Sequence, residues 1–344
     1  MTSTIYDVAK LAGVSTATVS RVINNLGNVR PTTEKKVNEA MALLNFTPNA
    51  LAQSFASNKS FTIGFIMSLY EHSNDIDIDR NALSQYHTEL FKGINAILEQ
   101  KGYNLLILHS KNQLEHQIRL LMRQKKIDGL IIGQLPEDTP TFRSIIDEQL
   151  PVVYMGHIYQ FNKGLHIYAQ YNIYLNKVLA YLYDLGHRRV LFFCLRDPQV
   201  LLKEWSELNY DYTSKMDIRF ERCPSEKKYV KERIDFHFTK SNIPTAVFSE
   251  LLSDVQPILS SLGSLGFVVP NDVSLMSIEH VKDAGEAFYP RLTNIYVPVY
   301  QMGKSAVTLL LDYMDGTQVN YDYEAIIDSP LIERDSVTKY SEKK

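Results

Sequence analysis

The sequence has little cysteine, no long apolar run and no metal-binding pattern. Its 344 residues include only two cysteines, Cys194 and Cys223, and no CxxC pair or histidine-rich cluster. This pattern predicts free thiols in a reducing cytoplasm, with neither a bound metal nor a cofactor. No stretch reaches the ~18 apolar residues of a membrane span, and the N-terminus has no apolar signal core. We therefore expect a cytoplasmic protein without a membrane partner.

Motifs of the common enzyme classes are also missing. The chain has no GxSxG sequence, no Walker phosphate loop and no GxGxxG after an expected strand. Paired acids such as Glu250 and Glu279 could transfer protons, but 39 Asp and Glu residues make chance pairs common. We therefore expect a protein that is not an enzyme.

Charge is distributed unevenly between the start of the chain and the rest. The first 60 residues carry six Lys or Arg and three Asp or Glu, whereas the whole chain has a net charge of −3. This distribution indicates that the weakly basic N-terminal segment binds phosphate groups, whereas the acidic remainder does not. The length predicts two or three domains, and a composition that is 45% apolar and 22% charged is typical of globular proteins.

Two short helices joined by a tight turn are predicted near the N-terminus. Thr4 can cap the first helix, with Asp7 completing a capping box, while Gly13 supplies the turn and Ser15 can cap the second helix. The first helix is expected to bury Ile5, Val8, Leu11 and Ala12. The second presents small or hydrogen-bonding side chains and one cation: Thr16, Ala17, Thr18, Ser20, Arg21 and Asn24. That surface suits phosphates and base edges, and a generic helical hairpin in a core is the alternative.

The string DVAKLAGVSTATVSRVIN, residues 7–24, closely resembles the DNA-binding headpiece of the LacI/GalR family of bacterial transcription regulators. On this reading, Thr16 and Ala17 contact base edges in the major groove, and Arg21 pairs with a guanine. Phosphate contacts would come from Tyr6, Ser15, Thr18, Ser20 and Asn24. A third helix from about residue 32 would complete a helix-turn-helix headpiece of residues 1–47.

A hinge is expected after the headpiece, over residues 48–60. Asn49 can cap a helix of about two turns, which is marginal in water by itself. The resemblance implies a hinge helix that forms when two copies meet over the DNA minor groove, with contacts from Asn49, Ala52 and Phe55. Phe55 stands where family members carry a leucine wedge, and phenylalanine can also unstack a base step. A flexible linker is the alternative.

From residue 61 onward, expected strands and helices alternate with short connections. Strands are predicted at 61–67, 103–108, 127–133, 151–155, 186–194, 245–249 and 272–278. The alternation predicts an α/β fold, with parallel sheets covered by helices and arranged as two lobes. Such lobes bind small ligands at the carboxyl ends of their strands.

The family resemblance continues at 184–187, 266–270 and 290–295, and so covers roughly residues 4–335. It implies two Rossmann-like lobes of the periplasmic-binding-protein type I kind, three crossing strands and a homodimer. The effector-binding and dimerisation core would span 61–335. Its first lobe would comprise about 61–160 and 290–318, and its second lobe about 161–289 and 319–335.

Polar residues that family members use for sugars are largely exchanged in this chain. The matching places in the second lobe fall on Gln170, Glu250 and Glu279, and Arg196 lies earlier than the family's arginine. In the first lobe, three polar side chains follow strand ends: Tyr70, Gln134 and His157. These groups can hydrogen-bond a ligand, although a solvated side chain at a strand end is the alternative for each. We expect a cleft whose effector is a sugar or sugar derivative, with a non-sugar effector as the alternative.

The sequence therefore predicts a repressor of a carbohydrate-utilisation operon that binds a pseudo-palindromic double-stranded DNA operator as a dimer and is controlled by a small-molecule effector. A solute-binding protein of a transporter is the alternative, against which the basic headpiece argues. One subgroup of the family is regulated by a phosphorylated carrier protein, which it binds through basic residues on a late helix. Thr308 and Asp312 stand there in this chain, and an acidic residue argues against a phosphocarrier partner.

Overall fold

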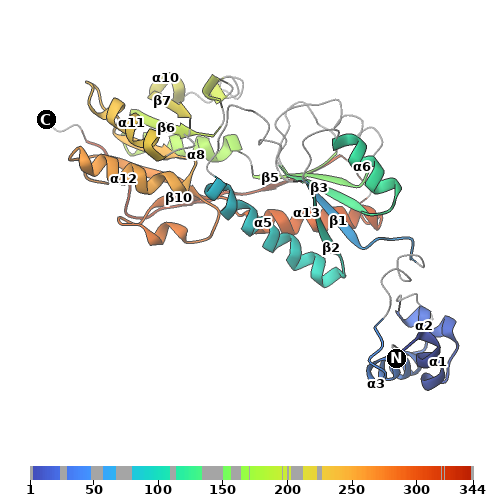
Figure 1. Cartoon of the computed structure of the whole chain (residues 1–344). Coiled ribbons are helices and arrows are strands. Elements are labelled where there is room, and N and C mark those ends of the chain that lie inside the picture. Colours follow the sequence, from blue (N-terminus) through green and yellow to red (C-terminus); the bar gives the residue numbers. More distant parts are fainter. Residues whose placement is uncertain are drawn as a thin grey trace. The chain divides into compact units, whose positions relative to one another are not determined.

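Figure 1 presents the computed structural model of the chain. The structure describes residues 3–23, 29–47, 57–66, 80–108, 114–133, 150–155, 164–169, 171–195, 197–199, 201–202, 212–222, 227–318, 320 and 322–341. Within these ranges, no helix combines the length and the apolar character needed to cross a membrane.

The described part of the N-terminal head consists of the short helices α1 (Ile5–Ala12), α2 (Thr16–Ile23) and α3 (Pro31–Leu43). The predicted capping box is confirmed, because Thr4 N donates to Asp7 Oδ2 at 2.8 Å. Thr18 N donates to Ser15 Oγ at 3.1 Å, which confirms the second cap. Gly13 has a φ of 68°, so the turn between α1 and α2 uses a conformation that favours glycine.

The core of the head is built from small and β-branched side chains. Its buried members are Val8, Ala9, Ala12, Val19, Val22, Val37 and Ala40. The expected burial of Leu11 is wrong, since this side chain is 53% exposed. Leu11 lies about 60° beyond Val8 around the helix, which puts it outside a buried stripe centred on Val8, Ala9 and Ala12.

The first lobe contains a six-stranded sheet in the order β11-β5-β4-β3-β1-β2. The strands are β1 (Thr62–Ile66), β2 (Asn104–Leu108), β3 (Gly129–Gly133), β4 (Val152–Met155), β5 (Leu165–Ala169) and β11 (Tyr323–Ile327). Four pairings of this sheet are parallel: β1 with β3, β3 with β4, β4 with β5, and β5 with β11. The helices are α5 (Arg80–Lys101), α6 (Leu114–Arg123) and α13 (Val299–Met314). Figure 1 shows α5 and α13 side by side.

The second lobe contains another six-stranded sheet, in the order β12-β10-β9-β8-β6-β7. Its strands are β6 (Arg189–Cys194), β7 (Asp217–Arg222), β8 (Ala246–Ser249), β9 (Ser274–Glu279), β10 (Thr293–Tyr296) and β12 (Leu331–Ile332). Only β12 runs antiparallel, against β10, among the described pairings. The helices are α8 (Tyr171–Asp184), α10 (Tyr212–Lys215), α11 (Lys227–Phe238) and α12 (Val255–Ser264), with the 3₁₀ turns η2 (Leu252–Asp254) and η3 (Ala284–Ala287).

The predicted α/β fold is confirmed, but the strand pairings move the expected lobe boundaries. β5 pairs with β4, so the first sheet extends past the expected start of the second lobe at residue 161. β10 pairs with β9 in the second sheet, although residues 290–318 were assigned to the first lobe. β11 returns to the first sheet by pairing with β5. These errors concern long-range pairing, which a local sequence pattern does not specify.

Candidate nucleic-acid interface and effector cleft

Helix α2 carries five of the residues predicted to contact DNA: Thr16, Ala17, Thr18, Ser20 and Arg21. Ala17 and Arg21 are exposed and lie four positions apart, which places them on the same side of the helix. Thr16, Thr18 and Ser20 are partly buried beside them. The helix contains no acidic residue, so no carboxylate on it repels an approaching phosphate.

Two further predicted phosphate contacts lie at the surface of the head. Ser15 is exposed at the start of α2, where its Oγ lies 2.9 Å from Thr18 Oγ1. Tyr6, on α1, is 73% exposed. The remaining predicted DNA contacts, Asn24, Asn49, Ala52 and Phe55, lie outside the described residues and stay predictions.

A cavity of about 240 Å³ lies beside the carboxyl ends of β8 and β9. Its polar lining includes Gln85 from α5 together with Glu250, Ser253, Gln256 and His280 of the second lobe. Glu250 follows β8 directly and is 1% exposed, and its Oε2 accepts a hydrogen bond from the backbone amide of residue 195. The buried Ser253 Oγ has no hydrogen-bond partner within the described part of the chain. The cavity therefore offers a carboxylate, amides and a free hydroxyl to a polar ligand.

Glu250 is the one predicted effector contact that the described residues place on this cavity. The other positions except Glu279 lie outside the described residues: Tyr70, Gln134, His157, Gln170 and Arg196. They stay predictions.

Glu279, the last residue of β9, is occupied by other protein groups. Its Oε1 lies 3.3 Å from Arg334 Nη2, and its Oε2 accepts from Gly285 N at 2.8 Å and Asn294 Nδ2 at 2.9 Å. The side chains of Glu279 and Arg334 are 0% and 4% exposed. This geometry gives Glu279 a structural role, in contrast to the predicted contact with an effector. The prediction rested on a family position that contacts sugars and did not include Arg334, 55 residues later.

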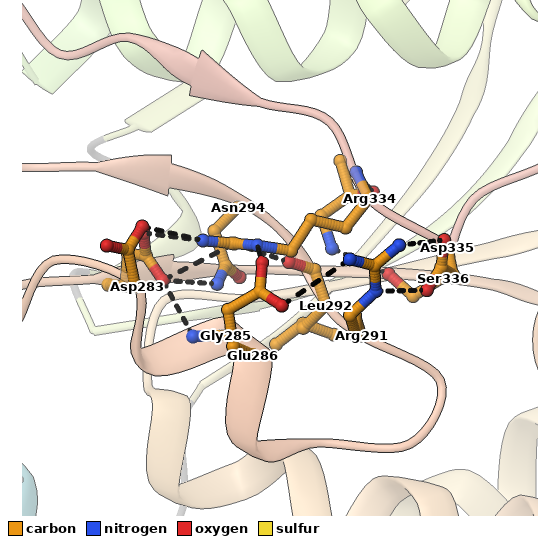
Figure 2. Close-up of polar contacts among 11 residues, drawn as sticks. Asp283, Gly285, Glu286, Arg291, Leu292, Asn294, Arg334, Asp335 and Ser336 are labelled. Carbon is orange, nitrogen blue, oxygen red and sulfur yellow. Dashed lines mark hydrogen bonds and ion pairs between the residues drawn. The ribbon is translucent and has the colours of Figure 1, made fainter.

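Arg334 joins the loop after β9 to the end of β12. Figure 2 shows its guanidinium beside the carboxylates of Asp283 and Glu286 in that loop. Nε donates to Glu286 Oε1 at 2.7 Å, Nη1 donates to Leu292 O at 2.8 Å, and Asp283 Oδ1 lies 3.6 Å from Nη2. A buried guanidinium with these partners fixes the backbone that leads from β9 to β10.

Matches to known proteins cover both the head and the lobes. The family model for bacterial regulatory proteins of the lacI family matches residues 4–49. The model for periplasmic binding proteins and the sugar binding domain of the LacI family matches residues 78–204, and that for a periplasmic binding protein-like domain matches residues 179–337. The chain belongs to the LacI family. It is a DNA-binding transcription regulator with a helix-turn-helix head.

Relatives of this LacI-family chain match it over almost its whole length. Catabolite control protein A of Staphylococcus epidermidis is 29% identical over 330 residues, which cover 93% of this chain and 94% of the relative. The protein of the same name from Priestia megaterium is 29% identical over 331 residues, which cover 93% and 95%. Both relatives are named as control proteins.

Solved structures show the same fold as this LacI-family chain. The lac repressor dimer bound to operator and the anti-inducer ONPF matches with a TM-score of 0.74 and 22% identity, over 98% of this chain and 100% of that chain. The transcriptional regulator CelR in complex with cellobiose matches with a TM-score of 0.64 and 20% identity, over 97% and 99%. At these identities the likeness concerns the fold.

Several cavity residues of this LacI-family chain were missed by sequence reasoning. Ser253 and Gln256 follow β8 in the turn η2 and the start of α12, and Phe288 follows η3. A signal was available for the first two, because the segment after a parallel strand in an α/β lobe starts at the ligand-binding edge. Gln85 comes from the first turns of a long helix and had no comparable signal.

Two histidines of the second lobe should make this LacI-family chain less stable in acid. Burial lowers the pKa of His280 to about 4, and burial also lowers the pKa of His187, whose side chain is 1% exposed. In the unfolded chain both rings titrate near 6.5. Below that pH the unfolded chain binds protons that the folded rings do not, so the free energy of unfolding falls until the pH passes the folded pKa. Between about pH 7 and pH 5, urea denaturation should show a loss of about 2 kcal/mol from His280 alone.

The variant His280→Gln is the control for this pH dependence. It should keep the contribution of His187 but remove that of His280, so its stability should change less over the same pH interval. A wild-type stability that stays constant or rises as the pH falls through this window would contradict the assignment of neutral buried rings.

Proposed function

We propose that this chain is a sequence-specific repressor that binds a pseudo-palindromic operator as a homodimer in the cytoplasm. The observation that carries the proposal is the acid-free outer side of α2, with Ala17 and Arg21 exposed, in a head that matches the LacI family. A two-fold dimer presents two such helices in opposite directions, which requires an operator with matching two-fold symmetry.

The first lobe offers a surface that supports dimerisation. Strand β2 is at the edge of its sheet, and its side chains Leu106 and Ile107 are 37% and 49% exposed. Apolar side chains on an edge strand favour association with another surface. In the proposal, that surface belongs to a second copy of the chain.

The proposed effector is a sugar or sugar derivative that binds the cavity beside the carboxyl ends of β8 and β9, and the proposed target is an operon for carbohydrate use. Glu250, Ser253 and Gln256 provide acceptors and donors that suit hydroxyl groups. The transcriptional regulator CelR, whose structure has the same fold, is solved with cellobiose. An effector that binds one arrangement of the lobes better than another would change operator affinity by at most that free-energy difference. On α13, Thr308 and Asp312 are exposed, and neither favours a phosphoprotein, so the proposal includes no phosphocarrier.

Thermal-shift measurements with glucose, ribose, cellobiose, glucose 6-phosphate, glutamate and adenine identify the effector class. A ligand that binds only the folded chain raises its midpoint temperature. A rise with one of the neutral sugars supports the proposed effector. A rise with glutamate or adenine alone would assign this regulator to the non-sugar alternative.

Replacing Arg21 with alanine should weaken operator binding by about 1–3 kcal/mol and relax the preference at one base pair of each half-site. The reason is that an exposed guanidinium on α2 can donate two hydrogen bonds to one guanine. The measurement is a binding titration of the full chain against a selected operator and against single-base variants, with the stoichiometry expected to be two chains per operator.

Lys35→Ala is the matched control, since Lys35 is an exposed cation of the same head but lies on α3. It removes the same charge and should leave the base preference unchanged. If Arg21→Ala alters neither affinity nor preference, Arg21 does not read bases. If no duplex is preferred over random competitor, the proposed function itself is wrong.

A further inference from the structure

An aromatic contact joins the two lobes next to the cavity. Tyr86, on α5, and His280, directly after β9, have ring centroids 5.3 Å apart and planes at 88°. Both side chains are partly buried. Helix α5 packs beside α13 in the first lobe, whereas β9 is a central strand of the second sheet. The pair is therefore a side-chain contact between the first lobe and the second.

The contact continues into the first lobe as a row of rings. Tyr86 and His87 have centroids 5.5 Å apart, His87 and Phe91 6.2 Å apart, and Phe91 and Phe65 5.1 Å apart. Phe65 is 0% exposed in β1, the first strand after the segment that follows the head. The row thus reaches from the loop after β9 to the start of the first lobe.

The second-lobe end of the row stands on a fixed support. His280 follows Glu279, whose carboxylate is held by Arg334, Gly285 N and Asn294. Because the backbone at His280 is already ordered, it loses little conformational entropy when the ring contacts Tyr86. The His280 ring can therefore hold its partner in place. The Tyr86 and His280 contact is therefore built between two ordered elements rather than between mobile side chains.

We propose that Tyr86 and His280 form a latch that holds the two lobes together when the cavity is empty. His280 lines the cavity, and Gln85, the neighbour of Tyr86, lines it from the first lobe. A ligand that enters this cavity contacts His280 directly, and it contacts Gln85, the chain neighbour of Tyr86. Edge-to-face aromatic pairs shift an equilibrium by about threefold to tenfold beyond the area they bury, which is enough to set the ratio of two lobe arrangements. The latch is a property of the lobes, and its effect on DNA rests on the proposed function.

The test measures the distance between the lobes by pulsed electron paramagnetic resonance on the full, ligand-free chain. Spin labels at Thr308→Cys on α13 and Ser260→Cys on α12 occupy exposed positions of the two lobes. Cys223→Ser removes one native thiol, and Cys194 is buried. Labelled chain is mixed with excess unlabelled chain, so that the distances measured are those within one chain.

Tyr86→Ala and His280→Ala should each raise the population with separated lobes by about threefold to tenfold. Tyr86→Phe keeps the ring and should retain the wild-type distance distribution, and the double alanine variant should open no further than either single variant. Tyr86→Leu, which keeps apolar volume but not the ring, should behave like Tyr86→Ala and guards against a folding defect.

An unchanged distribution in Tyr86→Ala and His280→Ala, with native circular dichroism, would overturn the latch. So would opening by Tyr86→Phe equal to that of Tyr86→Ala, because the ring would then not be the cause. Operator titrations of the same proteins keep the two proposals distinguishable. If the variants open as expected but the chain prefers no duplex, the latch is supported and the repressor function is wrong. If the chain binds its operator but the distances stay unchanged in the variants, the repressor function is supported and the latch is wrong.

Discussion

Replacing Arg334 with methionine is expected to lower the free energy of unfolding by about 3–5 kcal/mol, because it leaves a buried carboxylate without its counter-charge. Glu279 is 0% exposed, and Arg334 is the cation within reach of it among the described residues. Leu292 O and Glu286 lose donors in the same variant. The measurement is urea denaturation of the full chain, followed by circular dichroism.

Arg291→Met is the control for this loss. Arg291 also bonds a carboxylate, with 2.6 Å between its Nε and Asp335 Oδ2, but the two side chains are 53% and 49% exposed. Water screens such a pair, so its removal should cost far less. A second variant, Arg334→Met combined with Glu279→Leu, should recover part of the loss, because no buried charge then remains unpaired. Equal losses in Arg334→Met and Arg291→Met would show that burial of the pair does not matter.

The head and most strands could be predicted because their signals are local. The caps at Thr4 and Ser15 and the turn at Gly13 each need only a few neighbouring residues, and all three are confirmed. Continuous apolar runs also predicted β3 and β6, which are almost fully buried. No strand was predicted at β5 or β10, and their residues were assigned to the wrong lobes, because the sheet that each strand joins depends on partners far away in the chain.

The same distinction explains the outcome at the cleft. Glu250 and Glu279 were both selected because they stand at places in the second lobe where family members carry residues that contact sugars. Glu250 lies on the cavity, whereas Glu279 is taken by Arg334 from a strand that returns 55 residues later. No sequence pattern near Glu279 predicts its contact with Arg334. The contact of Tyr86 with His280 depends in the same way on two segments that only the folded chain brings together.

Gly93→Ala in α5 is expected to destabilise the chain by about 2–3 kcal/mol, toward the upper end of what overpacking costs. A Cβ at Gly93 would lie 2.0 Å from Tyr300 O, a backbone atom of α13, so no side-chain rotation can relieve the clash. Gly303 meets α5 in the same way, with 2.5 Å between its Cβ position and Leu90 O. The two helices must therefore separate, and the loss should be measured by urea denaturation.

Gly263→Ala is the matched control, because the same substitution should have the opposite sign there. Gly263 lies in α12 with nothing within 4 Å of its Cβ position, so alanine should stabilise that helix by about 0.5 kcal/mol through its higher helix propensity. Stabilisation by both variants would mean that α5 and α13 are not held in close contact by glycine. If Gly93→Ala does push α5 away from α13, it also displaces Gln85 and Tyr86. The variant should then loosen the cavity wall as well as the fold, because one rigid helix carries both.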